Sequence, residues 1–137
     1  MLPRPENRVT LDEGLTDAWG IPTLHIDCSF SSNEHAMLDH MVDSVTGMIK
    51  VAGGRIVGDP VYFAPGGFIH ETGTARMGTD PGDSILNEFA QCWDAPNVYV
   101  MDGAAFPSGG WQNPTFTMMA VAGRASSHLT EQLKSGW

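Results

Sequence analysis

The stretch NVYVMDGAAFPSGGWQNPTFTMM, at residues 97–119, holds the pattern that decides the fold class. It opens with a short apolar run at 97–101, which predicts a buried strand that ends at Asp102 and Gly103. A glycine-rich loop follows and leads into a helical pattern. In open α/β sheets, cofactors bind at the carboxyl ends of strands arranged in this way. The stretch therefore predicts an α/β fold with a cofactor site just after the strand.

A long helix is predicted from the end of the same stretch. Asn113 suits the N-cap and Pro114 suits the first helical position, where its missing N–H costs nothing, and the pattern continues to about residue 133. A helix N-terminus presents free N–H groups and the positive end of the helix dipole, so it favours an anion or an electron-rich ring edge. Because glycines in the preceding loop allow a close backbone approach, we expect a cofactor cradle here.

A histidine motif lies upstream, in HETGTARMG at residues 70–78. His70 enters a turn built on Gly73 and Gly78, with the fixed positive charge of Arg76 between them. The two glycines allow the chain to bend tightly around a ligand. Taken alone, the motif fits a structural histidine in a tight turn better than a catalytic one, so the role of His70 depends on its context.

The first half of the chain predicts two strands and a helix. Residues 8–11 and 23–30 alternate in polarity as half-buried strands do. Ser31 and Glu34 have the spacing of a capping box, and the glycines at 53–54 stop the helix that follows. The apolar residues of this helix recur at helical spacing, at Leu38, Met41, Val45, Met48 and Ile49.

Composition places the chain among globular proteins. It has 137 residues, of which 42% are hydrophobic and 9% aromatic, which is enough for one compact domain with a core. Its 16 glycines and 9 prolines indicate a loop-rich architecture. The net charge is −9, and the 7 lysines and arginines are scattered singly, so we expect no nucleic-acid partner.

The sequence predicts neither a metal site nor a membrane span. Cys28 and Cys92 form no CxxC pair, which argues against a cysteine zinc site or a dithiol redox site. His35 and His40 are five residues apart, so a helix places them on different faces. No stretch approaches the roughly 20 apolar residues of a membrane span. We recognise no export signal in these residues, and the localisation stays open between cytoplasm and periplasm.

Three motifs in a fixed order carry a resemblance to a known family: HETGTARMG, NVYVMDGAAFP and NPTFTMMAVAGRA. They resemble the C-terminal portion of the glucose–methanol–choline (GMC) flavin oxidoreductases, closest to the gluconate-dehydrogenase-like and pyranose-oxidase-like branch. The resemblance implies an incomplete fragment of a larger α/β fold. By this resemblance, residues 1–90 are the C-terminal part of an α+β substrate-binding domain that includes the His70 motif. Residues 91–137 are then the last strand and helix of a Rossmann-like FAD-binding domain.

The resemblance also implies two catalytic positions. His70 matches the family's active-site histidine, a base that takes the hydroxyl proton of an alcohol, sugar or polyol while hydride passes to N5 of FAD. Asn113 matches the second catalytic position and implies an amide donor to the alcohol oxygen. Trp111 is the first candidate for a substrate contact, with core packing as its alternative.

Five positions match the family's cofactor contacts. Asp102 and Gly103 correspond to the strand end that lies against FAD, and Asn113, Pro114 and Thr115 correspond to the helix start that reaches the flavin. The family's G-x-G-x-x-G fingerprint does not occur in this sequence. The resemblance therefore implies that most of the FAD site lies in an N-terminal part outside this chain, which would be its partner.

Three functions stay open at this point. The chain is the C-terminal part of a flavin-dependent oxidoreductase that is active only with the rest of the enzyme, or a non-enzymatic binding module or inactive remnant that no longer holds FAD, or a small metal-dependent hydrolase. For the first, oxygen, a quinone or a cytochrome are the candidate electron acceptors. Because open sheet edges and apolar faces need partners, we expect the isolated chain to be unstable or prone to aggregation.

Overall fold

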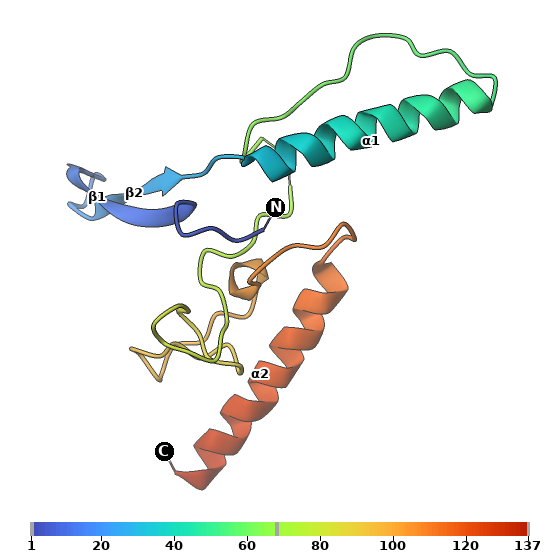
Figure 1. Cartoon of the computed structure of the whole chain (residues 1–137). Helices are drawn as coiled ribbons and strands as arrows, with labels where there is room; N and C mark the ends of the chain where they lie inside the picture. The colour runs from blue at the N-terminus through green and yellow to red at the C-terminus, as the bar shows by residue number, and fades with distance from the viewer. Residues whose placement is uncertain (1, 68, 137) are drawn as a thin grey trace.

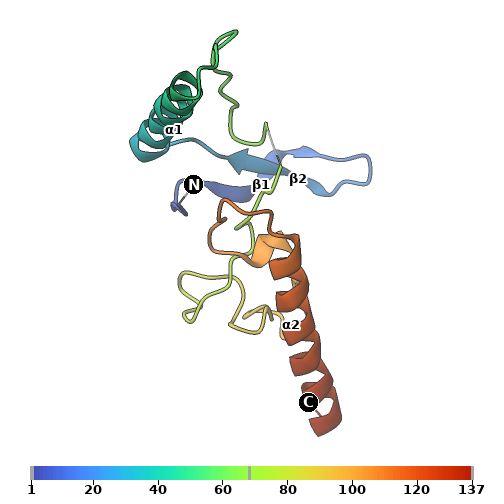
Figure 2. The same cartoon turned by 90° about the vertical axis from the view of Figure 1, so that its right-hand side faces the viewer.

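The computed structural model describes residues 2–67 and 69–136 and has an α+β arrangement. A β-hairpin and the first helix lie on one side of the molecule, while the second helix projects from a cluster of loops on the other (Figure 1 and Figure 2). The regular elements of the described residues are β1 (Arg8–Thr16), β2 (Pro22–Asp27), α1 (Ser32–Val51), a 3-10 helix (Gly103–Ala105) and α2 (Thr115–Ser135). The small sheet and the two helices confirm the α+β character that was expected.

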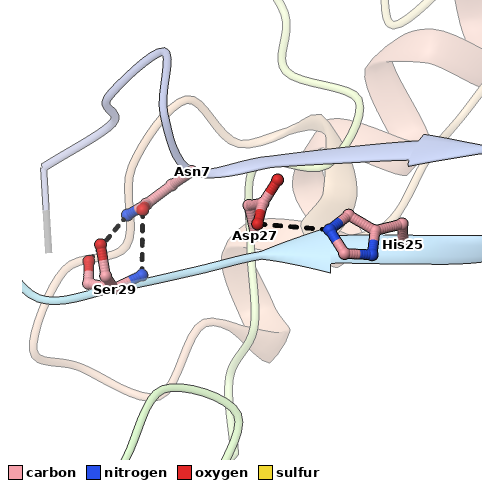
Figure 3. Close-up of polar contacts among 4 residues, drawn as sticks. All are labelled: Asn7, His25, Asp27 and Ser29. Carbon is pink, nitrogen blue, oxygen red and sulfur yellow. Dashed lines mark hydrogen bonds and ion pairs between the residues drawn. The ribbon is translucent and has the colours of Figure 1, made fainter.

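The two predicted strands form an antiparallel hairpin. The prediction of the second strand is too long, because β2 ends at Asp27 rather than at residue 30. Beyond Asp27, the side chain of Asn7 replaces a neighbouring strand as the partner of the main chain. Its Nδ2 donates to the Ser29 carbonyl at 3.1 Å, and its Oδ1 accepts the Ser29 N–H at 3.0 Å (Figure 3).

Helix α1 begins and ends where the sequence predicts. Ser31 is the N-cap: its Oγ accepts the Asn33 N–H at 3.2 Å, and the Glu34 carboxylate accepts the Ser31 N–H at 2.9 Å. Hydrogen bonds from the Ser31 hydroxyl and then from its main-chain N–H lower the pKa of Glu34 to about 2. The helix stops just before Gly53, whose φ of 76° lies in the left-handed region.

Acid should weaken the start of α1. The pKa of Glu34 is lower in the folded chain than in the unfolded chain, where a glutamate has a pKa of about 4.3. The ionised carboxylate therefore stabilises the folded form above that pH, and this contribution is lost as the pH falls towards about 2. Circular dichroism should show helix loss across this window, and Asp39→Asn should leave the transition in place. The same transition in Glu34→Gln would contradict the assignment.

The second half of the structure packs around a small core. Leu86, Ala90, Ala105 and Ala125 are fully buried or nearly so. Because Ala125 lies on α2 and the others on the loops and the 3-10 helix, this core joins the loop cluster to α2. The partly buried side chains around it are those of Ala75, Met77, Cys92, Tyr99, Val100 and Met101.

The apolar run at 97–101 differs from its prediction as a strand. It makes one isolated bridge, between Gln91 and Tyr99, and the Val100 N–H donates to the Ala90 carbonyl at 3.0 Å. A continuous strand needs neighbours that hydrogen-bond along its length. Among the described residues the run has only a short partner in the loop before it, so it stays irregular.

Helix α2 begins later than predicted. Pro114, rather than Asn113, is the N-cap, and its carbonyl accepts the Met118 N–H at 2.9 Å. Pro114 already has helical angles, with φ −85° and ψ −4°, so the first turn closes from this residue. Within the part of the chain that the structure describes, no side chain caps this turn. The prediction of Asn113 as N-cap is therefore wrong, and its amide is not used to hold the helix.

Candidate functional site

The histidine motif and the turn at Asp102 and Gly103 lie side by side. Three main-chain hydrogen bonds join them, from Gly73 N–H to Gly103 O (3.3 Å), from Ala75 N–H to Ala104 O (3.0 Å) and from Met77 N–H to Ala105 O (2.8 Å). The next loop also passes the motif, since a Cβ on Gly109 would lie 3.5 Å from the Thr72 Oγ1. The tertiary structure thus brings together segments that are far apart in the sequence.

An open cavity of about 270 Å³ lies where these segments meet the first turn of α2. Two carboxylates, two threonines and a thioether surround it. The lining residues are Glu71, Thr72, Thr74, Asp102, Gly103, Ala104 and Met118. Of these, sequence reasoning singled out Asp102 and Gly103 only. The other side chains sit within the same three motifs, and that proximity is the signal that could have found them.

Gly103 is a point of close approach between three segments. A Cβ at this position would lie 2.7 Å from the Met118 Cε and 3.1 Å from the Glu71 carbonyl oxygen. A side chain here would make the end of Met118 move and the Glu71 carbonyl shift by a few tenths of an ångström, so glycine allows these segments to pack this closely. Asp102 fixes the turn beside it, because its Oδ1 accepts the Ala104 N–H at 2.9 Å and caps the 3-10 helix.

His70 has an unusual main-chain conformation. It is exposed, and its φ of 72° lies in the left-handed region. For a residue with a Cβ this conformation costs on the order of 1 kcal/mol. Such residues cluster at functional sites, where the surrounding structure holds the side chain in one direction. The conformation of His70 therefore agrees with its candidacy as a functional residue.

The remaining predicted site residues lie on the glycine-rich loop and at the start of α2. Trp111 is 91% exposed, which excludes core packing for it in this structure. Asn113 and Thr115 are also exposed, and Pro114 is half-buried. Across residues 2–67 and 69–136, no hydrogen bond, ion pair or ring contact joins His70 to Asn113. The convergence of these two side chains stays a prediction.

Neither a metal-binding cluster nor a membrane-spanning helix occurs within residues 2–67 and 69–136. Among them, no group of three or more His, Cys, Asp or Glu side chains could hold a metal ion. No helix of the described chain is long and apolar enough to cross a membrane. Cys28 and Cys92 are free thiols, the first exposed and the second half-buried.

Residues 3–122 match the sequence model of a protein family, GMC oxidoreductase. This match covers the hairpin, α1, the histidine motif, the cavity and the start of α2. The chain belongs to the GMC oxidoreductase family. The match confirms the resemblance that the three motifs carry, and GMC oxidoreductases are generally FAD-dependent.

Relatives of this GMC domain are oxidases and dehydrogenases. It is 34% identical to the 2-methyl-1,2-propanediol dehydrogenase of Mycolicibacterium austroafricanum, over 96% of this chain and 24% of that protein. It is 32% identical to the C-glycoside 3-oxidase of Arthrobacter globiformis, over 95% of this chain and 25% of that protein. It is 29% identical to the gluconate 2-dehydrogenase flavoprotein of Pantoea cypripedii, over 93% of this chain and 22% of that protein. The chain thus spans about a quarter of the length of these relatives.

Proposed function

We propose that this chain forms the catalytic end of an FAD-dependent oxidoreductase that oxidises an alcohol, a sugar or a polyol. The observation that carries the proposal is the main-chain pairing of the histidine motif with the turn at Asp102 and Gly103. This pairing sets a segment with a candidate base beside residues that match the family's cofactor contacts. The relatives add support, because they are named as enzymes of a diol, a C-glycoside and gluconate.

His70 is the catalytic base in this proposal. A neutral imidazole can take a hydroxyl proton near neutral pH, which makes the carbon a better hydride donor. Asn113 donates an amide N–H to the alcohol oxygen and stabilises the alkoxide as it forms. This role is open to Asn113 because its side chain does not cap α2. Trp111 offers an exposed aromatic face that can stack on a sugar ring.

The residues present fit one edge of FAD. Gly103 lines the cavity, where the absence of a Cβ lets Met118 and the Glu71 carbonyl pack closely against the turn. The uncapped first turn of α2 suits the electron-rich edge of a flavin ring. We assign the contacts with the cofactor to Asp102, Gly103, Asn113, Pro114 and Thr115. When bound, FAD supplies the hydride acceptor.

The proposal also assigns the two parts of the chain. Residues 1–90 belong to the substrate-binding domain and residues 91–137 to the FAD-binding domain, and both are completed by an N-terminal part of the same family. The core around Leu86 and Ala125 contains residues from both sides of this division, so the two parts meet there.

A chimeric enzyme tests the proposal. In it, this chain replaces the matched segment of the Mycolicibacterium dehydrogenase. Mixed without oxygen with 2-methyl-1,2-propanediol, a C-glycoside or gluconate, the folded and flavin-loaded chimera should lose the visible absorbance of oxidised flavin with at least one of them. A chimera that holds flavin and is reduced by none of the three would contradict the proposal and favour a binding module.

Replacing Asn113 by alanine in this chimera should lower kcat by about 10²–10³-fold, because removal of one preorganised donor to a developing oxyanion has effects of this size. Flavin should stay bound through the other four assigned contacts, at Asp102, Gly103, Pro114 and Thr115, which absorbance spectra would show. Gln112→Ala, at the neighbouring exposed position, is the matched control and should change kcat little. Equal losses in the two variants would remove the specific role of Asn113.

A further inference from the structure

Helix α2 runs beside the loop cluster in both views and meets it through small side chains (Figure 1 and Figure 2). The side chain of α2 that enters the core is that of Ala125, which is 1% exposed, and Ala122 lies half-buried on the same side of the helix. Packed elements hold their register when the side chains of one fit between those of the other. Because alanines offer little to interlock, this core alone gives α2 a weak hold along its own axis.

A group of aromatic and cationic side chains gives α2 a firmer hold. The Phe89 ring stacks on the His128 imidazole, with 4.0 Å between the ring centroids and 7° between the planes. The Arg124 guanidinium lies over the same Phe89 ring, 5.0 Å from its centroid. The Tyr99 ring also meets His128, with 6.4 Å between the centroids. We call these four residues the Phe89 clamp.

The Phe89 clamp fixes the height of α2 along its axis. Arg124 and His128 are four residues apart, so they lie on one side of the helix in successive turns, about 6 Å apart along the axis. A single ring that contacts both of them keeps both contacts at only one height of the helix. A slide by one residue, about 1.5 Å, would weaken the stack with His128 and displace the guanidinium from the ring.

The two loop rings of the clamp are fastened to the run at 97–101. Tyr99 belongs to this run, and Phe89 directly precedes Ala90, whose carbonyl accepts the Val100 N–H at 3.0 Å. The run leads into the turn that is proposed to contact the cofactor. The clamp therefore sets the height of α2 relative to that turn.

The other end of α2 carries the helix start that is proposed to contact the cofactor. In its first turn the Met118 Cε lies so close to the loop turn that a Cβ on Gly103 would be only 2.7 Å from it. Methionine is flexible, so this contact follows the helix and does not hold it in place. Among the residues that the structure describes, the four of the Phe89 clamp do not line the cavity. Phe89 can therefore act on the site only through the position of α2.

We propose that Phe89 is a positioning residue for hydride transfer. Through Arg124 and His128 it sets the height of α2, and with it the distance between the first turn of α2 and the histidine motif. This inference rests on the proposed function for the reaction that takes place between them. Enzyme rates respond steeply to such distances, since a misplacement of about 1 Å far from the chemistry can cost about 100-fold.

Phe89→Ala in the chimeric enzyme tests this role. The variant should keep its flavin and a KM within about threefold of the unchanged chimera, while the rate of flavin reduction falls by about 10–100-fold. A loss confined to the rate is expected because the ring lies outside the cavity. Phe89→Tyr keeps the ring and should restore the rate. Glu88→Ala, at the neighbouring exposed position, is the matched control and should change neither quantity.

A second measurement reports the height of α2 without substrate or turnover. In the chimera with isotope-labelled methionine methyl groups, the Met118 Cε methyl should show a nuclear Overhauser effect to Gly103, and Met118→Leu identifies its signal. Phe89→Ala should remove this effect, because α2 then no longer has one height. Phe89→Tyr and Glu88→Ala should retain it. Unchanged helix content by circular dichroism would show that α2 still forms in all three variants.

Several results would overturn the role of Phe89. They are an unchanged rate of flavin reduction in Phe89→Ala, a Met118–Gly103 effect that persists in this variant, a loss that Phe89→Tyr does not restore, and equal losses in Glu88→Ala. A higher KM with an unchanged rate would also contradict it, because a contribution to substrate binding would then be the cause. A chimera that none of the substrates reduces would refute the proposed reaction instead, and the methyl signal would still test the clamp.

Discussion

Replacing His70 by alanine should lower kcat of the chimeric enzyme by about 10²–10⁴-fold, the range expected when a general base is lost. Flavin should stay bound, because the residues assigned to the cofactor are unchanged. The rate of flavin reduction under anaerobic single-turnover conditions measures the effect on the chemical step directly.

The matched control for this experiment is His40→Ala. His40 is exposed on α1, outside the cavity and outside all three motifs. Its removal tests whether the loss of any exposed histidine changes the rate. Turnover within a few-fold of the unchanged chimera in His70→Ala would show that His70 is not the base. The left-handed main chain of His70 would then be a feature of the turn alone.

Replacing Leu86 by alanine should lower the free energy of unfolding of the second half by about 2–5 kcal/mol, because a buried leucine is exchanged for a cavity. Leu86 is the one large side chain that is fully buried among the described residues, and the other buried core residues are alanines. A core this small has little stability to lose. Hydrogen exchange at the Met77 and Gly78 amides, which bond to the Ala105 and Leu86 carbonyls, reports the change.

Ile85→Ala is the control for the core. Ile85 neighbours Leu86 and is also a large aliphatic residue, but its side chain is 51% exposed. The main-chain N–H groups of Ile85 and Leu86 both donate to the Arg76 carbonyl, at 3.1 Å and 3.2 Å respectively. The two variants therefore keep the same backbone hydrogen bonds. The control should lose far less protection than Leu86→Ala. Similar losses would mean that the core is held by these backbone bonds and not by the buried side chain.

The sequence by itself determined the features whose causes are local. The capping box of Ser31 and Glu34 and the stop at Gly53 act within one helical turn, and the structure forms both. The two strands followed from alternation over a few residues, whereas their antiparallel pairing is known from the structure. The family could be recognised from three short motifs in the sequence, without knowledge of how they pack in the structure.

Only the tertiary structure decided which segments meet. The run at 97–101 has the composition of a strand, yet it stays irregular because strands are made by neighbours, and those present pair with little of it. The N-cap of α2 is Pro114 and not the predicted Asn113, because the Pro114 carbonyl accepts the hydrogen bond that closes the first turn. The pairing of the histidine motif with Gly103 depends on a contact at long sequence separation, where a missing Cβ admits Met118. Such contacts are set by packing between distant residues, which local patterns do not encode.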